Sequence, residues 1–384
     1  MKITNVEVIH FRTRHRGRSS GSRWGYGVWI DNEEVESTSA ITRISTDEGI
    51  TGHMTGGNKA TMEGPIKNLL VGENALNREK IWHWMDQMCT FGHGLSEHEL
   101  GIVDCALWDL LGQKAGVPVY QLLGGTREKV EAYASTHPNL GGPEVYIELA
   151  QDCVKRGYKA FKVHANICWN PHTQEPAPQL PGFPREDVEI CRAVRQAVGD
   201  DIVLMLDPFG VYTLEESLWV ARELEKLDYY WLEHPMVETR VEAYRRLTQE
   251  TEIAICSPEH VKGGPFARAE WLLQGACDML RVDMGYGGIT GCWKVINLCQ
   301  LYGVQCELHG VGAPHVHLAA ATPEATCRYY ERGLLRPGRD YDASPPHLEQ
   351  IADPIDSEGY VHVSQEPGLG MAYNWDYIDA NRID

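Results

Sequence analysis

The order of hydrophobic and polar positions divides the chain into two patterns, the first of which covers roughly the first 125 residues. Alternating positions predict a strand over residues 2–12, and residues 39–53 predict two strands joined by an acidic-glycine turn at 47–49. Apolar positions then recur every three or four residues and predict helices, at 59–71, 77–90 and 96–115. Strands followed by helices indicate an α+β unit.

From Val130 onward the pattern changes to alternating strands and helices. The candidate strands are short apolar runs at 130–135, 158–164, 202–207, 229–233, 252–257, 279–283, 304–309 and about 327–331. Helical spacing lies between them, for example at 186–197 and 214–226. Eight strands over roughly 200 residues favour a (β/α) barrel over an open doubly wound sheet. After a short strand at 360–363, the tail is expected to return to the first unit.

Three of the predicted barrel strands are followed by a carboxylate at equal intervals. Asp207, Glu233 and Glu259 each end an apolar run, and both intervals are 26 residues (233 − 207 and 259 − 233). The C-terminal ends of successive parallel strands meet at one mouth of a barrel. Three like charges there repel one another unless a cation lies among them, and hard oxygen ligands suit Mg²⁺. The alternative interpretation is that each acid caps the helix after its own strand.

Composition limits the classes of function. The net charge of −19 argues against nucleic-acid binding, and no apolar run approaches the length of a membrane span. The 11 cysteines form no C-x-x-C pair, which favours reduced thiols over disulfides or a zinc site. The first residues lack the apolar region of a signal peptide. We therefore predict a cytoplasmic protein with neither nucleic acid nor membrane as a partner.

Further motifs accompany the three acids. They are the run ALWDLLGQKAGVPVYQLLGG at 106–125, the pair Lys162-x-His164 and the run GGITG at 287–291. Together they resemble the enolase superfamily, and within it the mandelate racemase subgroup (mandelate racemase/muconate lactonizing enzyme-like). The resemblance covers nearly the whole chain. It implies an α/β fold, a modified TIM barrel (β/α)7β with an N-terminal α+β capping domain.

The same resemblance carries further expectations. The capping domain would span residues 1–128, with the tail 355–384 returning to it, and the barrel would span 129–354. One Mg²⁺ per subunit would be held by the three strand-end acids, Asp207, Glu233 and Glu259. The reaction would remove a proton α to the carboxylate of a small-molecule substrate. A homo-oligomer, often an octamer, is also implied.

Lys162 and His164 lie two residues apart on the second barrel strand, so both face the same side. The subgroup has Lys-x-Lys here, with the second Lys as the base. His164 in that place is expected to serve as the base, because imidazole titrates near neutrality. Lys162 would then hold the substrate carboxylate. The alternative is that Lys162 is a surface lysine and His164 a packed core histidine.

His309 and Asp283 close the seventh and sixth strands, and adjacent strand ends would let Asp283 orient His309. The resemblance makes His309 the base or acid on the opposite face of the substrate. Which of His164 and His309 is the base stays open. The segment between Asp283 and the GGITG run is one residue shorter than the subgroup usually shows, so a displaced Asp283 is the alternative.

Glu331 matches the eighth-strand acid of the subgroup. By resemblance it donates a hydrogen bond to the enediolate and is therefore protonated. The alternative is an exposed Glu beside Arg328 and Arg332. His315 and His317 fall in the next helix and are predicted to be structural.

Three positions near the acids depart from the pattern of the subgroup. Phe209 stands where an Asn is often found, His234 replaces a second acid, and Pro258 replaces a Gly. The acid-to-His change makes the site less negative, and the loss of the Asn removes a polar substrate contact. These departures argue against a direct transfer of racemase activity.

Two loops are expected to contact the substrate. Residues 12–23 hold five arginines and by resemblance form the mobile capping-domain loop that closes over the barrel. A solvated basic loop or a subunit contact is the alternative for this segment. Residues 165–184 follow His164, and a loop of that length in a compact domain is usually functional or disordered. The predicted substrate-binding residues are Arg23, Trp24, Ser135, Trp169, His172 and His260.

These observations favour a Mg²⁺-dependent dehydratase of a sugar acid, an aldonate or an aldarate. A base removes the C2 proton, and an acid, expected to be His309, helps the 3-hydroxyl leave, giving a 2-keto-3-deoxy acid. The alternative enzyme is a racemase or epimerase of a hydroxy or amino acid, with His164 and His309 as opposed bases. A non-catalytic member would bind Mg²⁺ without exchanging a proton on any acid.

Overall fold

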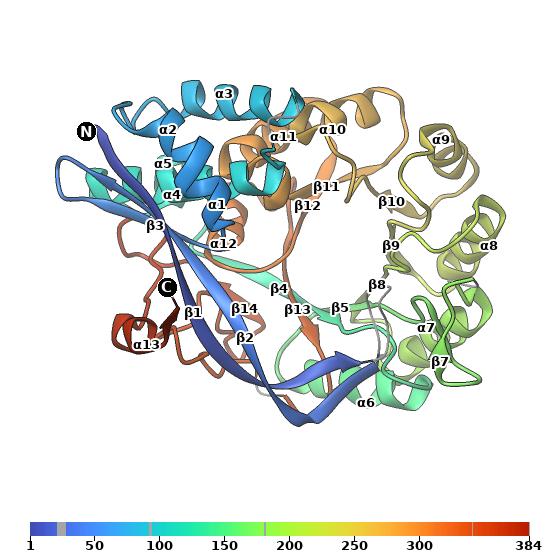
Figure 1. The fold of residues 1–384 in the computed structure, drawn as a ribbon. Coiled ribbons are helices and arrows are strands. Elements are labelled where there is room, and N and C mark those ends of the chain that lie inside the picture. The colour runs from blue at the N-terminus through green and yellow to red at the C-terminus, as the bar shows by residue number, and fades with distance from the viewer. Residues whose placement is uncertain (21–27, 92–93, 180–181, 340, 384) are drawn as a thin grey trace.

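The computed structural model describes residues 1–384 except 21–27, 92–93, 180–181, 340 and 384, and for residues 16–20 and 28–33 it describes the backbone only. The chain forms a four-stranded sheet near its N-terminus and a larger, mostly parallel barrel sheet (Figure 1). This is the predicted modified (β/α)7β barrel with an N-terminal α+β capping domain. The domain boundaries themselves stay a prediction.

The N-terminal sheet is antiparallel, with the order β15-β1-β2-β3. Its strands are β1 (Ile3–Ser20), β2 (Val28–Thr46) and β3 (Thr51–Thr55), so the predicted hairpin at 39–53 is confirmed. The prediction of a loop over residues 12–23 is wrong for 12–20, which continue β1 and pair with β2. Polar side chains are compatible with this strand because its main-chain groups bond to β2, and the side chains of Arg12 and Arg14 are exposed.

The helices of the N-terminal part pack on this sheet. They are α1 (Lys59–Thr61), η1 (Met62–Ile66), α2 (Lys67–Leu70), α3 (Arg78–Thr90), α4 (Glu97–Ala115) and α5 (Val119–Leu122). A capping box between Ser96 and Glu99 begins α4, and left-handed Gly116 ends it. Helix α4 is apolar on both sides, because Leu100 packs in the core of the N-terminal part and Trp108 in the barrel core. It therefore joins the two cores.

Within the described residues the barrel has eight parallel strands in the order β12-β11-β10-β9-β8-β5-β4-β13. Their bounds are β4 (Lys129–Thr136), β5 (Ala160–Val163), β8 (Val203–Leu206), β9 (Tyr229–Glu233), β10 (Ala254–Cys256), β11 (Met279–Asp283), β12 (Gln305–His309) and β13 (Tyr329–Leu335). The helices between them are α6 (Pro143–Lys155), α7 (Pro184–Val198), α8 (Leu214–Glu225), α9 (Val241–Glu250), α10 (Gly264–Leu273), α11 (Gly288–Tyr302) and α12 (Ala313–Ala321), with the short helix η2 (Met284–Tyr286) before α11. Every predicted barrel strand is confirmed.

The remaining segments are the loop after β5 and the C-terminal tail. The loop after β5 contains a small hairpin of β6 (Trp169–Asn170) and β7 (Glu175–Pro176). In the tail, β14 (Tyr360–His362) pairs with β4, and after α13 (Trp375–Ala380) the strand β15 (Arg382–Ile383) pairs with β1. The end of the tail thus lies beside β1 of the N-terminal sheet. Among the described residues, no helix combines the length and the apolar character needed to cross a membrane.

Candidate active site

The C-terminal ends of the barrel strands bring the predicted catalytic and metal-binding side chains into one cluster. Parallel pairing sets their register; for example, Asp283 of β11 lies beside His309 of β12. Ion pairs and hydrogen bonds link the members of the cluster. They are Lys162, His164, Asp207, Glu233, Glu259, Asp283, His309 and Glu331.

Asp207, Glu233 and Glu259 form a buried group of carboxylates that can hold a metal ion. One ligand oxygen from each lies within 4.8 Å of the others. Burial raises the pKa of Glu233 above its usual value, even though Arg281 and Lys162 oppose the shift. A divalent cation would offset the cost of burying these negative charges, and a set of oxygen ligands alone suits Mg²⁺. The side chains present therefore fit the metal ion that the sequence predicts.

Two buried cations form ion pairs with the acids of the site. Lys162 Nζ donates to both carboxylate oxygens of Glu233 at 3.0 Å and lies 3.0 Å from Glu331 Oε1. Arg281 lies 2.7 Å from Glu233 through Nε and 2.5 Å from Glu331 through a terminal nitrogen. Both cations are fully buried. The alternative of a surface lysine at position 162 is therefore wrong.

The surroundings of Glu331 favour its charged form. Burial opposes ionisation, but Lys162 and Arg281 hold the pKa of Glu331 well below its usual range. The Gly310 N–H also donates to this carboxylate at 3.0 Å. These contacts contrast with the protonated, donating Glu331 that the resemblance implies. The alternative of an exposed Glu is wrong, since the residue is buried.

His164 lies between a carboxylate and a backbone carbonyl. Its Nε2 is 2.8 Å from Asp207 Oδ2, and its Nδ1 donates to the Thr136 carbonyl at 2.9 Å. The carbonyl can only accept, so Nδ1 carries a proton and Nε2 is the atom directed at the acids. Ser135, a predicted substrate contact, is fully buried, and its hydroxyl lies 3.5 Å from His164 Nδ1. Ser135 thus lies on the Nδ1 side of the His164 ring, away from the nitrogen that faces the acids.

His309 and Asp283 form the predicted dyad, since His309 Nδ1 lies 2.5 Å from Asp283 Oδ2. On its other side, His309 Nε2 lies 2.8 Å from Glu259. Although burial opposes the charge, Glu259 and Asp283 raise the pKa of His309 well above its usual value. The short spacing before the GGITG run does not displace Asp283, because Asp283 pairs in register with His309 and its carboxylate reaches His309 Nδ1.

Two more histidines surround Glu259. His234 Nδ1 lies 2.9 Å from Glu259 Oε2, and although burial lowers its pKa, this hydrogen bond raises the pKa of His234 to about 9. His260 Nε2 lies 3.3 Å from Glu259 Oε1, and the His260 side chain is exposed. The ring of Phe209 packs against both imidazoles, at 5.7 and 5.4 Å between centroids. An aromatic side chain thus occupies the position where the subgroup often has an Asn.

A cavity of about 180 Å³ opens onto this cluster. His164 and His309 both line it, together with Glu259 and Glu331. It therefore presents two imidazoles and two carboxylates to a bound molecule. Its other lining residues are Phe209, Gly310, Val311, Gly333 and Leu334.

The remaining predicted substrate contacts are placed differently. Arg23 and Trp24 lie outside the described residues. Trp169 is buried, and its indole N–H has no hydrogen-bond partner among the described residues. His172 is exposed and pairs with Glu186 at 2.8 Å, so the structure does not bring it to the cluster.

The two histidines of α12 are buried, as a structural role requires. His317 accepts from the Tyr120 N–H and donates to the Leu369 carbonyl, at 3.1 and 3.2 Å. Burial lowers the pKa of both His315 and His317 to about 4. Neither lines the cavity.

Sequence reasoning missed two residues of the site. Arg281 precedes Asp283 by two positions, and this spacing places both on the same face of β11, which was a usable signal. Glu238 accepts from the backbone N–H groups of Glu259 and His260, both at 2.6 Å, and so fixes the loop after β10. Glu238 lies in the irregular loop between β9 and α9, where no periodic pattern of residues marks it in the sequence.

Comparisons with known proteins agree with this geometry. Residues 145–377 match the family described as enolase C-terminal domain-like, and residues 33–124 match the N-terminal domain of mandelate racemase/muconate lactonizing enzyme. The crystal structure of D-glucarate dehydratase from Agrobacterium tumefaciens complexed with magnesium is 37% identical, with a TM-score of 0.92 over 100% of both chains.

Two curated relatives differ in their named activities. D-gluconate dehydratase of Thermoproteus tenax is 30% identical over 74% of this chain, and the match spans only 56% of that protein. N-succinyl-L-Arg/Lys racemase of Bacillus cereus is 26% identical over 98% of this chain and 97% of its own. The two matched families together cover most of the sequence. The chain therefore belongs to the mandelate racemase/muconate lactonizing enzyme family of the enolase superfamily.

Proposed function

We propose that the chain is a hydro-lyase with Mg²⁺ as cofactor, which dehydrates a sugar acid, an aldonate or an aldarate. The observation that carries the proposal is the pair of imidazoles, His164 and His309, that line one cavity beside the acid triad. The relatives named as sugar-acid dehydratases support the same reaction class. The substrate is a small-molecule carboxylate.

Mg²⁺ would be held by Asp207, Glu233 and Glu259, and when bound it supplies Lewis-acid stabilisation of negative charge on the substrate carboxylate. Lys162 adds a fixed positive charge next to this triad, 3.0 Å from Glu233. Arg281 anchors Glu233 and Glu331 from inside the barrel. These cations keep the carboxylates in place without blocking the cavity, since neither lines it.

His164 is the proposed base. Its Nδ1 proton is held by the Thr136 carbonyl, so Nε2 is the atom that would take the C2 proton, once its 2.8 Å contact with Asp207 Oδ2 opens. His309 is the proposed acid, because Asp283 at its Nδ1 stabilises the imidazolium that must give its Nε2 proton away. The C2–H electrons form the C2–C3 double bond as the 3-hydroxyl leaves as water with that proton. Tautomerisation of the enol gives the 2-keto-3-deoxy acid.

The test is a screen of aldonic and aldaric acids with Mg²⁺. Keto product is detected with semicarbazide, and C2 deuterium is detected by mass spectrometry in D₂O. Keto product should appear with wild type and disappear in Glu233→Gln. Glu307→Gln is the matched control, because Glu307 is also a buried acid of a barrel strand but belongs to neither the acid triad nor the cavity lining. A Glu233→Gln variant as active as wild type would overturn the proposal.

A racemase or epimerase is the second candidate function. It is favoured by the same two histidines lining one cavity, and a relative named as a racemase matches nearly the full length. In the screen it predicts C2 deuterium without keto product, whereas a non-catalytic member would give neither signal. A cytoplasmic location and a homo-oligomer, often an octamer in this family, remain part of the proposal.

A further inference from the structure

Glu259 belongs to a second group of potential metal ligands besides the acid triad. One ligand atom from each of His234, Glu259 and His260 lies within 4.8 Å of the other two. His234 Nδ1 is 2.9 Å from Glu259 Oε2, and His260 Nε2 is 3.3 Å from Glu259 Oε1. Two nitrogen donors and one carboxylate therefore converge beside the acid triad, and we call these three side chains the His–Glu–His group.

The donor atoms of the His–Glu–His group differ in kind from those of the acid triad. Oxygen ligands alone suit Mg²⁺, whereas imidazole nitrogens suit transition-metal ions such as Zn²⁺. Two imidazoles and one carboxylate, with water in the fourth position, complete a tetrahedral set of ligands for Zn²⁺. The His–Glu–His group therefore fits Zn²⁺ better than Mg²⁺.

A fourth side chain, Glu238, contacts all three members of the group. Its carboxylate accepts from the backbone N–H groups of Glu259 and His260, each at 2.6 Å. Glu238 Oε2 also lies 4.0 Å from His234 Nε2, whereas Nδ1 of the same ring faces Glu259. A histidine that binds a metal usually has a carboxylate, carbonyl or water at its other ring nitrogen, which orients the ring. Glu238 is buried and occupies the place of such a supporting carboxylate.

Packing holds the two imidazoles near each other, and solvent reaches one of them. The rings of His234 and His260 lie 5.1 Å apart between centroids, edge to face. Phe209 packs against both rings. His234 and Glu259 are buried, whereas His260 is exposed. The ligands are thus arranged before an ion binds, and an ion can enter from the side of His260.

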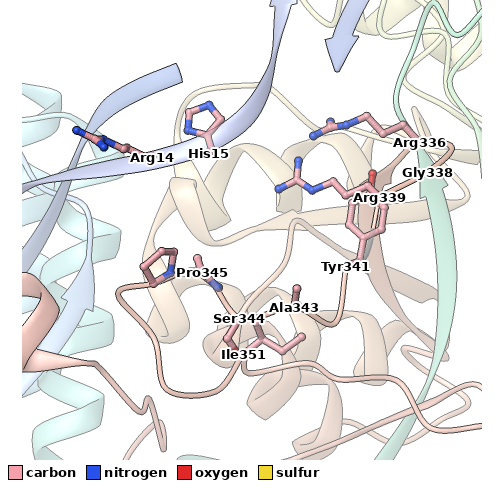
Figure 2. Close-up of a pocket in the computed structure, with 11 residues that line it drawn as sticks. Arg14, His15, Arg336, Gly338, Arg339, Tyr341, Ala343, Ser344, Pro345 and Ile351 are labelled. Atoms are coloured by element: carbon pink, nitrogen blue, oxygen red, sulfur yellow. The ribbon is translucent and has the colours of Figure 1, made fainter. Parts of the chain in front are cut away.

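A histidine among positive charges does not offer such a site. His15 lines a cavity of about 680 Å³, which shares no lining residue with the active-site cavity. Figure 2 shows His15 in one space with the side chains of Arg336 and Arg339. No carboxylate is among the described residues that line this cavity. Positive charges disfavour a cation there, whereas Glu259 and Glu238 supply negative charge at the His–Glu–His group.

We propose that His234, Glu259 and His260 form a second metal site, which binds a transition-metal ion such as Zn²⁺ and is linked to Mg²⁺ binding through Glu259. The linkage rests on the proposed function, which assigns Glu259 to Mg²⁺, whereas the second site does not. Two dications at one carboxylate repel each other and divide its charge. Zn²⁺ should therefore bind less tightly when Mg²⁺ is present, and Mg²⁺ less tightly when Zn²⁺ is present.

The experiment measures Zn²⁺ binding to the full chain after EDTA has removed all metal, by equilibrium dialysis without substrate. His260→Gln should weaken Zn²⁺ binding about a hundredfold and leave Mg²⁺ binding almost unchanged, because the acid triad stays intact. X-ray absorption at the zinc edge should show imidazole ligands in wild type. Glu233→Gln, which alters the acid triad alone, should keep these imidazole ligands. Added Mg²⁺ should raise the Kd of wild type for Zn²⁺.

His362→Gln is the matched control, because His362 is also an exposed histidine beside a carboxylate, 2.7 Å from Asp356, but has no second imidazole in a metal-binding group. It should leave Zn²⁺ binding unchanged. Equal Zn²⁺ affinity in wild type and His260→Gln, or Zn²⁺ held by oxygen atoms alone, would overturn the second site. A Kd for Zn²⁺ that does not respond to Mg²⁺ would overturn the linkage. If Glu233→Gln binds Mg²⁺ as tightly as wild type, the acid triad and the proposed function fail instead, and the zinc spectra still decide the second site.

Discussion

Arg281→Met tests whether the buried cations hold the carboxylates of the site. Arg281 is fully buried and contacts Glu233, Glu331, the Tyr133 hydroxyl at 3.0 Å and the Leu308 carbonyl at 2.7 Å. Breaking a buried ion pair from one side costs about 3–5 kcal/mol, because the partner charge is left uncompensated. Lys162 still lies 3.0 Å from both carboxylates. We therefore expect the lower end, a loss of about 3 kcal/mol in the free energy of unfolding.

The assay is urea unfolding of wild type and variant without added metal, together with thermal unfolding. An unfolding entropy of about 2 cal/mol/K per residue gives about 0.8 kcal/mol/K for 384 residues. The loss therefore corresponds to a fall in Tm of about 4 °C. The control is Arg192→Met, whose partner Glu223 lies 3.1 Å away at the surface; it should cost at most about 1 kcal/mol. Equal losses in the two variants would refute the reasoning.

Three further predictions concern the metal, the acid and pH. Mg²⁺ at a hundred times its Kd should add about 2.7 kcal/mol to the free energy of unfolding, measured by thermal unfolding with and without EDTA. Glu259→Gln should lose most of this gain, and full retention would contradict the metal assignment. His309→Asn should lower kcat for keto product about 10²- to 10⁴-fold, and an unchanged rate would remove His309 as the acid. Burial lowers the pKa of His317 from 6.5 to about 4. The contribution of neutral His317 to the free energy of unfolding is therefore complete above pH 6.5, and about 3 kcal/mol of it is lost as the pH falls to 4. Urea unfolding at both pH values should show a smaller loss in His317→Gln, and an equal loss in wild type would contradict this assignment.

The barrel could be predicted from sequence because its strands are short and most of them are largely apolar. The predicted strands 229–233 and 279–283 coincide with the residues of β9 and β11. Strands buried on both faces need such apolar runs, and a parallel barrel requires a helix between each pair. Once the strands were in order, the strand-end acids had to meet at one mouth. The acid triad followed from this geometry alone.

The charge states of the site residues could not be predicted from the sequence in the same way. The pKa of Glu331 is lowered by Lys162 and Arg281, which come from β5 and β11 and are distant from it in sequence. A motif names a carboxylate, but the dielectric and the neighbouring charges that decide its protonation exist only in the folded barrel. The placement of His172 has the same cause, because His172 follows β5 in sequence yet pairs with Glu186 of α7, which only the folded chain brings near it.

Polar composition also misled the expectation for the N-terminal segment. Residues 12–20 carry alternating arginines and were expected to form a loop, yet they extend β1 beside β2. A two-stranded ribbon at the edge of a fold needs few apolar side chains, because its main chain is satisfied by the partner strand and both faces are left to solvent or ligand. A segment of alternating arginines is therefore compatible with a paired strand as well as with a loop.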